Sequence, residues 1–204
     1  MTGLKIRPKL VFEPQYLAAN LPPRTFPKSK VGPIKIVIYG RPGVPRNLFV
    51  TLITSLDIAL QKYPKASFDI ISLGEKHTDV LLESGYVVRS LGKLPEHEYI
   101  ALLSTADLGI SLMMSPHPSY PPLEMASAGM LVITNDFFGY KRNLSDVFPN
   151  IHVVDPTVEQ IADKITEVIS KKSTQLNVSK GKNILGRPIN EVTDEVIRLI
   201  DRLK

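Results

Sequence analysis

The sequence predicts a doubly wound α/β domain of Rossmann-like type over residues 34–172, in which helices cover both faces of a parallel sheet. Short apolar runs rich in β-branched residues alternate there with segments of helical periodicity, and the links between them are short. This alternation is the pattern of parallel strands joined by crossover helices. The run 107–114 is almost continuously apolar, as expected of a strand that is buried on both faces.

Each strand is predicted from a short apolar run that ends at a turn residue. The first run lies between Pro33 and Gly40, and the second ends at Gly74. Strands are predicted over 34–39, 67–73, 86–89, 107–114, 130–134 and 151–154.

Helices are predicted where apolar residues recur at spacings of three and four. The first follows Asn47, a favoured N-cap residue, and is closed by Pro64. Another begins at Pro121, a position that tolerates proline, and is closed by Gly129. Helices are predicted over 49–60, around 79–83, and over 96–105, 121–128, 158–169 and 192–203.

The two ends of the chain differ from this central domain. Residues 1–33 contain six prolines that interrupt every helical pattern, so this segment is predicted to be an extended arm or an interdomain connector. Residues 173–204 are predicted to form an extension that ends in the last helix. A length of 204 residues suits one domain, or two small ones at most.

The composition excludes several kinds of chemistry. Because the chain has no cysteine, disulfides, thiolate metal sites and a cysteine nucleophile are ruled out. None of the four histidines is spaced as a metal ligand, so we expect no bound metal and no cofactor. No apolar run approaches 18 residues, and no segment of signal-peptide type begins the chain. The cytoplasm is therefore the expected compartment, and a location at the inner face of the membrane is the alternative.

The charge balance indicates an anionic partner. There are 25 Lys and Arg residues against 20 Asp and Glu, a net charge of +5. This mild excess suits a phosphate-bearing ligand or an anionic surface. It is too small and too dispersed to indicate a nucleic acid partner.

Ligands of open parallel sheets bind beyond the carboxyl ends of the strands, so the loops there are the first candidates. The loop after the first strand carries Gly40, Arg41, Gly43 and Arg46, and Asn47 follows. Two guanidinium groups beside a helix N-terminus form an anion site. The alternative is an ordinary turn with two solvated arginines. The glycines match neither the dinucleotide nor the P-loop spacing.

The segment after the fourth strand, residues 115–129, is the most informative. It reads Ser-Pro-His-Pro-Ser-Tyr-Pro-Pro-Leu-Glu-Met-Ala-Ser-Ala-Gly, and its four prolines restrict the backbone. The N–H groups of Ser119 and Tyr120 are expected near the positive end of the following helix. Glu124, in the first turns, is placed to accept two hydrogen bonds from a ribose diol. Alternatively, it only complements the helix dipole.

This segment resembles the signature of retaining GT-B glycosyltransferases of the family-4 group, which use nucleotide-activated sugars. Residues 121–129 are similar to the second half of the family's Glu-x7-Glu element, its methionine- and alanine-rich turn and its glycine. The regions 34–41, 91–95, 99–111 and 155–162 resemble other parts of the same domain in the same order. The amino-acid sequence of residues 115–125 is most similar to that of bacterial rhamnosyltransferases that build surface polysaccharides.

The sequence departs from the family pattern in two ways. Pro116 stands where the first glutamate of Glu-x7-Glu is expected, so His117 or Ser119 is a candidate to replace its contact with the transferred sugar. A GT-B enzyme also has two such domains, with the active site between them. This chain resembles only the C-terminal, donor-binding half, and an acceptor-binding domain or subunit is the implied partner.

The resemblance implies transfer of a sugar from a nucleotide diphosphate to a saccharide hydroxyl with retained configuration. The nearest likeness implies rhamnose on dTDP, and a UDP-linked donor is the other option. Arg41 and Arg46 are expected to act in catalysis by stabilising the departing diphosphate.

The resemblance also implies the residues that bind the donor. Glu124 would hold the ribose and Leu94 would contact the base through its backbone. The other expected contacts with the nucleotide sugar are Gly40, Asn47, Gly74, His117, Ser119 and Tyr120.

Two other classes of protein stay open. One is a GT-B-like sugar-nucleotide epimerase or a non-catalytic nucleotide-sugar-binding module. The other is an unrelated doubly wound domain of response-regulator or flavodoxin type. A response regulator would show an acidic pair, and a flavodoxin a loop rich in Ser and Thr, where this chain has Gly40 and Arg41.

Overall fold

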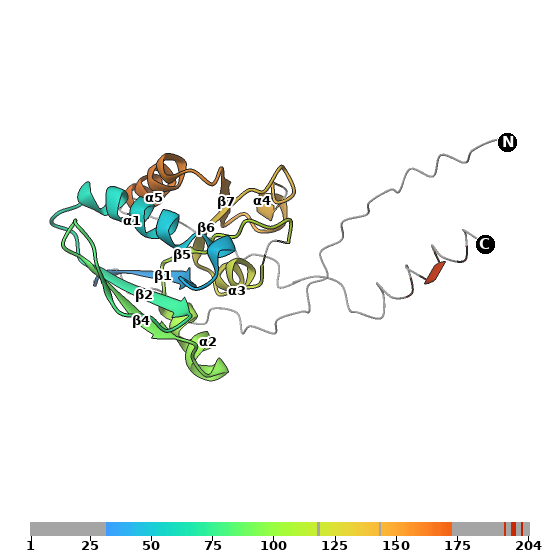
Figure 1. Ribbon diagram of the computed structural model, residues 1–204, viewed down its shortest axis with the longest axis horizontal. Coiled ribbons are helices and arrows are strands. Elements are labelled where there is room, and N and C mark those ends of the chain that lie inside the picture. The colour runs from blue at the N-terminus through green and yellow to red at the C-terminus, as the bar shows by residue number, and fades with distance from the viewer. Residues whose placement is uncertain are drawn as a thin grey trace. The chain divides into compact units, whose positions relative to one another are not determined.

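A seven-stranded sheet organises the computed structural model, which describes residues 32–117, 119–142, 144–172, 194, 197, 198 and 201 (Figure 1). The strand order is β3-β4-β2-β1-β5-β6-β7, and all neighbours run parallel except β3 and β4. The strands are β1 Ile34–Gly40, β2 Phe68–Gly74, β3 Val80–Leu81, β4 Val87–Gly92, β5 Leu108–Ile110, β6 Leu131–Asn135 and β7 Ile151–Val154. The predicted parallel α/β fold is confirmed.

Helices lie on both faces of this sheet. The described helices are α1 Phe49–Gln61, α2 Glu96–Thr105, α3 Pro121–Ser127, α4 Leu144–Val147 and α5 Val158–Lys172. Helices α1 and α5 pack side by side and share one apolar core with Leu108 and Ile110 of β5 (Figure 1). A Cβ atom built on the intervening Gly109 would lie 2.7 Å from Met125 Sδ of α3. Because side chains alternate along a strand, α3 covers the opposite face.

The helix predicted around 79–83 is wrong, because this segment forms the edge strand β3. Val80 and Leu81 pair antiparallel with Val88 and Val87 of β4. Gly85, at a φ of +85°, allows the tight turn between the two strands, and the N–H of Leu82 donates to the carbonyl of Tyr86 at 2.8 Å. Two paired residues carry too little periodicity to be distinguished from a helical turn.

The strand predicted over 107–114 is shorter than expected, since β5 ends at Ile110. Beyond it the backbone leaves the ladder. The N–H of Met113 donates to Asn135 Oδ1 at 2.6 Å, and the N–H of Met114 donates to the carbonyl of Arg46 at 2.7 Å. The apolar run therefore continues as a loop at the carboxyl edge, in which Leu112 is buried and Met114 is exposed.

Predictions for the chain ends lie mostly outside the described residues. This holds for the arm over 1–31 and for 173–193. Within the helix predicted over 192–203, the four described residues are helical: Asp194, Ile197, Arg198 and Asp201. Helix α4 was not predicted.

Candidate functional site

The loops after β1 and β2 meet at the carboxyl edge of the sheet. Gly40 and Gly74 occupy the same level of the two paired strands. A Cβ atom on Gly40 would lie 2.3 Å from Ser72 Oγ, and one on Gly74 would lie 3.1 Å from Arg41 Cγ. Gly74 also has a φ of +105°, which favours glycine. The stem of Arg41 therefore packs across the end of β2.

Glu75 closes the loop that follows β1. Its N–H donates to the carbonyl of Gly40 at 3.0 Å, and its carboxylate accepts the N–H of Gly43 at 3.1 Å. The local sequence around Glu75 does not indicate this role. The sequence does show a glycine at the end of each of these two neighbouring strands, which indicates that the loops after them approach each other closely.

Arg46 and Asn47 join this loop to the segment after β5. They lie in the 3-10 turn Pro45–Asn47, and the Arg46 side chain is exposed. The carbonyl of Arg46 accepts the N–H of Met114, and Asn47 Nδ2 donates to the carbonyl of Leu112 at 3.3 Å. The predicted capping role of Asn47 is wrong. Leu48, at a φ of 51°, precedes α1 without a side-chain cap, and Asn47 is instead buried.

His117, Ser119 and Tyr120 form a local cluster after β5. The N–H of Ser119 donates to His117 Nδ1 at 3.0 Å, and the rings of His117 and Tyr120 lie 5.8 Å apart. Burial and the positive charge of Lys141 lower the pKa of His117. The neutral ring can therefore accept at Nδ1. The Ser119 amide, expected to face a diphosphate, is thus engaged within the protein.

Glu124 is held by a tyrosine from a different helix. The hydroxyl of Tyr99 in α2 donates to Glu124 Oε2 at 2.6 Å. Burial, followed by the negative charge of Glu124 and this hydrogen bond, raises the pKa of Tyr99, so the hydroxyl stays a donor. A carboxylate has acceptor positions for further partners. Sequence reasoning missed Tyr99, because only the fold brings α2 beside α3.

Lys141 is a buried cation in the loop after β6. Its side chain is among the largest that are fully buried, with 1% exposed. Its Nζ donates to the carbonyl of Met113 at 2.6 Å. Burial lowers its pKa to about 8, although the charge of Asp136 opposes this. Lys141 therefore ties this loop to the segment after β5, a role that nothing in the local sequence indicated.

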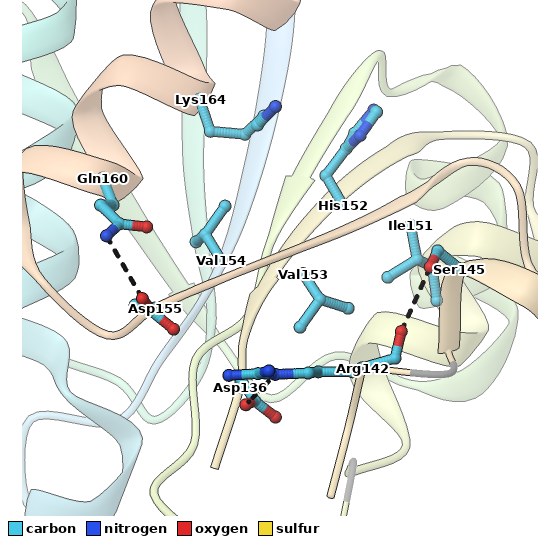
Figure 2. Close-up of a pocket in the computed structure, with 10 residues that line it drawn as sticks. All are labelled: Asp136, Arg142, Ser145, Ile151, His152, Val153, Val154, Asp155, Gln160 and Lys164. Atoms are coloured by element: carbon cyan, nitrogen blue, oxygen red, sulfur yellow. Dashed lines mark hydrogen bonds and ion pairs between the residues drawn. The ribbon is translucent and has the colours of Figure 1, made fainter. Parts of the chain in front are cut away.

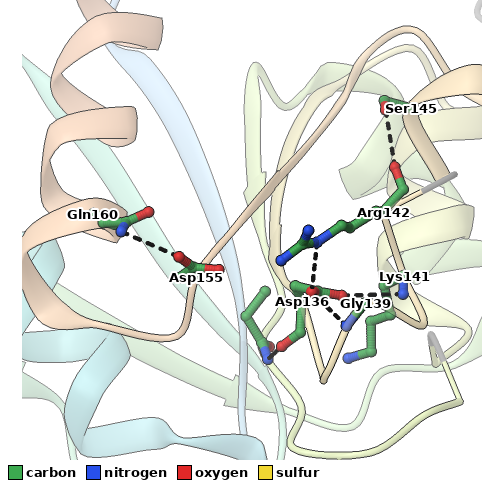
Figure 3. Close-up of polar contacts among 8 residues, drawn as sticks. Asp136, Gly139, Lys141, Arg142, Ser145, Asp155 and Gln160 are labelled. Carbon is green, nitrogen blue, oxygen red and sulfur yellow. Dashed lines mark hydrogen bonds and ion pairs between the residues drawn. The ribbon is translucent and has the colours of Figure 1, made fainter.

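Asp136 organises the same loop (Figure 3). Its carboxylate accepts the N–H of Gly139 at 2.7 Å, the N–H of Lys141 at 3.1 Å and Arg142 Nε at 3.1 Å. Burial alone would raise the pKa of Asp136, but hydrogen bonds from backbone N–H groups and from Arg142 outweigh it and lower the pKa. The carboxylate is therefore ionised and fixes the turn.

A hollow of about 520 Å³ lies beside the outer strand β7 (Figure 2). It does not include the predicted donor-site residues. Its lining residues are Asp136, Arg142, Ser145, Ile151, His152, Val153, Val154, Asp155, Gln160 and Lys164.

Leu94 follows β4, which pairs directly with β2. It is half-buried in the turn before α2, beyond the end of β4, and β4 is separated from β1 by β2.

Within the described residues, no group of three His, Asp or Glu side chains could hold a metal ion. None of the helices in that part of the chain has the length and apolar character to cross a membrane.

Comparison with known proteins gives one matching family. The model described as "WsaF, C-terminal domain" matches residues 34–166. The O-antigen biosynthesis protein RfbC of Myxococcus xanthus is 30% identical over 159 residues, which are 78% of this chain and 12% of RfbC. The chain therefore spans about an eighth of this curated relative.

Solved structures share the fold at low identity. WaaG, a glycosyltransferase involved in lipopolysaccharide biosynthesis, has a TM-score of 0.56 at 16% identity over 74% of this chain and 41% of WaaG. The UDP-GlcNAc 2-epimerase from Neisseria meningitidis, solved with UDP-GlcNAc bound, has a TM-score of 0.52 at 15% identity. That match covers 81% of this chain and 45% of the epimerase. The described domain thus has the fold of one half of a GT-B protein.

Proposed function

The chain belongs to the WsaF C-terminal domain family, and from this premise we propose that it is the donor-binding half of a retaining glycosyltransferase. The proposed reaction transfers a sugar from a dTDP- or UDP-linked donor to a saccharide hydroxyl. Rhamnose is the proposed sugar, on the resemblance of residues 115–125 to bacterial rhamnosyltransferases. The likeness of the chain to an O-antigen biosynthesis protein supports a saccharide product.

One observation carries this proposal: hydrogen bonds join the loops after β1, β2 and β5 at a single edge of the sheet. Glu75 binds the loop that carries Arg41, and the carbonyl of Arg46 binds Met114. Both arginines thus belong to one anchored loop, which is tied to the segment that leads into α3 and Glu124. Ligands of open parallel sheets bind at this edge.

The proposed mechanism is electrostatic stabilisation of the leaving group. Negative charge grows on the diphosphate as its bond to the sugar breaks, so donors fixed in advance lower the barrier. Arg41 and Arg46 supply guanidinium groups that bind phosphate through paired hydrogen bonds. Packing of Arg41 against Gly74 restricts its motion before the donor binds. Retention at the anomeric carbon is carried over from the family resemblance.

The proposed nucleoside contacts involve Glu124 and the turn before α2. Tyr99 fixes one carboxylate oxygen of Glu124, which orients the group for the ribose hydroxyls. Leu94 is the proposed backbone contact for the base. His117 is the proposed replacement for the missing first glutamate, and its neutral ring suits a sugar hydroxyl better than a phosphate.

Glu124→Gln is expected to weaken binding of UDP by about 1.5–3 kcal/mol and to weaken binding of dUDP less. The reason is that ribose offers two hydroxyls to the carboxylate and deoxyribose only one. Titration calorimetry with both nucleotides measures the difference. Tyr99→Phe is a companion variant, because it removes the partner that orients Glu124 and keeps the carboxylate. If both variants lose stability equally and neither loses affinity, Glu124 only supports the fold.

An epimerase is the second candidate function, favoured by the shared fold with the Neisseria meningitidis enzyme. An epimerase would convert a sugar nucleotide with no acceptor present. Incubating the chain with dTDP-rhamnose and with UDP-GlcNAc, followed by NMR of the sugar, separates the two functions. We expect both sugars to remain unchanged.

A further inference from the structure

Lys141 carries a positive charge that the folded chain does not neutralise. Its side chain is buried, and among the described residues the partner of its Nζ is the carbonyl of Met113, at 2.6 Å. The ammonium group forms no ion pair in that part of the chain, because the Asp136 carboxylate on the same loop is paired with Arg142 (Figure 3). A buried charge without a counter-ion lowers stability, which indicates a role in function.

This charge lies close to the loop that carries Arg46. Lys141 Nζ donates to the carbonyl of Met113, and the N–H of the next residue, Met114, donates to the carbonyl of Arg46 at 2.7 Å. Because a single peptide group separates these two hydrogen bonds, Nζ lies within about 8 Å of the Arg46 carbonyl oxygen. Charges interact over roughly 10 Å in about 0.1 M salt, and buried charges are screened less. The ammonium group is therefore within electrostatic reach of an anion bound at this loop.

Two ionisable side chains interact electrostatically with Lys141: Asp136 on its own loop and His117 on the segment after β5. Burial lowers the pKa of Lys141 to about 8, and the Asp136 carboxylate opposes this only in part. Burial and the charge of Lys141 lower the pKa of His117, whose ring is therefore neutral. Neither neighbour supplies a free negative charge, since Asp136 is already paired with Arg142.

We propose that the buried ammonium group of Lys141 is a third positive charge of the donor site and that the diphosphate of the bound nucleotide neutralises it. Lys141 acts through space from beneath the loop, whereas Arg41 and Arg46 bind the phosphates directly. A charge that is fixed in advance also stabilises the departing diphosphate, because nothing has to reorganise as negative charge grows. The inference rests on the proposed function, since it adds a charged group to the same site.

Binding of the diphosphate should therefore change the protonation of Lys141. A nearby anion favours the charged form, so it raises the pKa of Lys141 above the value of about 8 in the free chain. At about pH 9, roughly nine in ten free molecules carry a neutral Lys141, and the complex takes up protons as it forms. Because the complex holds more protons than the free chain, affinity should fall as pH rises, by about tenfold between about pH 7.5 and 9.5.

Titration calorimetry of the full chain with UDP and dTDP at about pH 9, in two buffers of different ionisation enthalpy, measures this proton uptake. We expect uptake by the wild type and none by Lys141→Met. Lys62→Met is the matched control, because Lys62 is half-exposed and paired with Asp163, and it should take up protons as the wild type does. The lowered pKa of His117 keeps that ring neutral at this pH, so it does not contribute.

A comparison of UDP with uridine at about pH 7.5 distinguishes charge from support of the fold. Lys141→Met should weaken binding of UDP about tenfold and leave binding of uridine unchanged, because only UDP carries the diphosphate. If the variant weakens both ligands equally, Lys141 acts only by holding the Met113 carbonyl.

Inorganic phosphate, as a second probe, separates this inference from the proposed function. If a nucleotide binds without proton uptake, or if Lys141→Met takes up as many protons as the wild type, the inference is refuted and the donor half stands. If phosphate binds with uptake that depends on Lys141 and neither nucleotide binds more tightly than phosphate, the buried charge serves an anion site and the donor half is refuted. If no probe binds at millimolar concentration, both are refuted.

Discussion

Arg41→Ala is expected to weaken binding of a nucleoside diphosphate by about ten- to a hundredfold and to leave nucleoside binding nearly unchanged. Hydrogen bonds to charged groups contribute about 1.5–3 kcal/mol, and the nucleoside lacks the phosphates that receive them. Calorimetric titration with UDP and uridine, and with dTDP and thymidine, measures both affinities on the same variant. Arg46→Ala should show the same selectivity.

Arg142→Ala is the matched control for this experiment, since Arg142 is an exposed arginine of a neighbouring loop that is paired with Asp136. It should leave diphosphate affinity unchanged. Equal losses for the nucleoside and its diphosphate in Arg41→Ala would mean that Arg41 acts only through its packing against Gly74.

Between pH 8 and pH 10.5, the wild-type chain is expected to gain about 3 kcal/mol of stability relative to Lys141→Met. The pKa of Lys141 falls from 10.5 to about 8 on burial. Above pH 8 the unfolded chain therefore holds a proton that the folded chain has released, so stability rises with pH until the unfolded lysine also loses its proton. Below pH 8 the full cost of burying the ammonium group is present.

Urea unfolding at several pH values measures how the free energy of unfolding depends on pH. Lys62→Met is the control, because Lys62 is a half-exposed surface lysine that pairs with Asp163. The free energy of unfolding of Lys62→Met should change with pH in the same way as that of the wild type. If Lys141→Met also shows the wild-type pH dependence, Lys141 is not desolvated in the folded chain.

Local sequence was sufficient where one segment determines its own structure. The β-branched run before Gly40 and the periodic run after Leu48 both fold as predicted. At 79–83 the hydrophobic pattern was too short to distinguish a strand from a helix, because only two residues pair with β4. At Asn47, a favoured cap residue was displaced because Leu48 takes the left-handed conformation before the helix. Tertiary packing overrode local preference there.

The contacts within the candidate site depend on residues that are distant in the chain. Tyr99 and Glu124 are 25 positions apart, and Lys141 and Met113 are 28 apart. Neither pair has a spacing that a periodicity reveals, because the crossover connections of the sheet bring the partners together. The sequence predicted candidate residues in the loops that follow β1, β2, β4 and β5. It could not show that Glu75 and His117 engage amide groups within the protein.

Titration of the full chain with dTDP and UDP at low and high salt tests the central claim most directly. The donor-half account predicts that at least one nucleotide binds with measurable heat and that its affinity falls as salt rises, because paired charges carry part of the binding. Absence of heat with both nucleotides at millimolar concentration would contradict it.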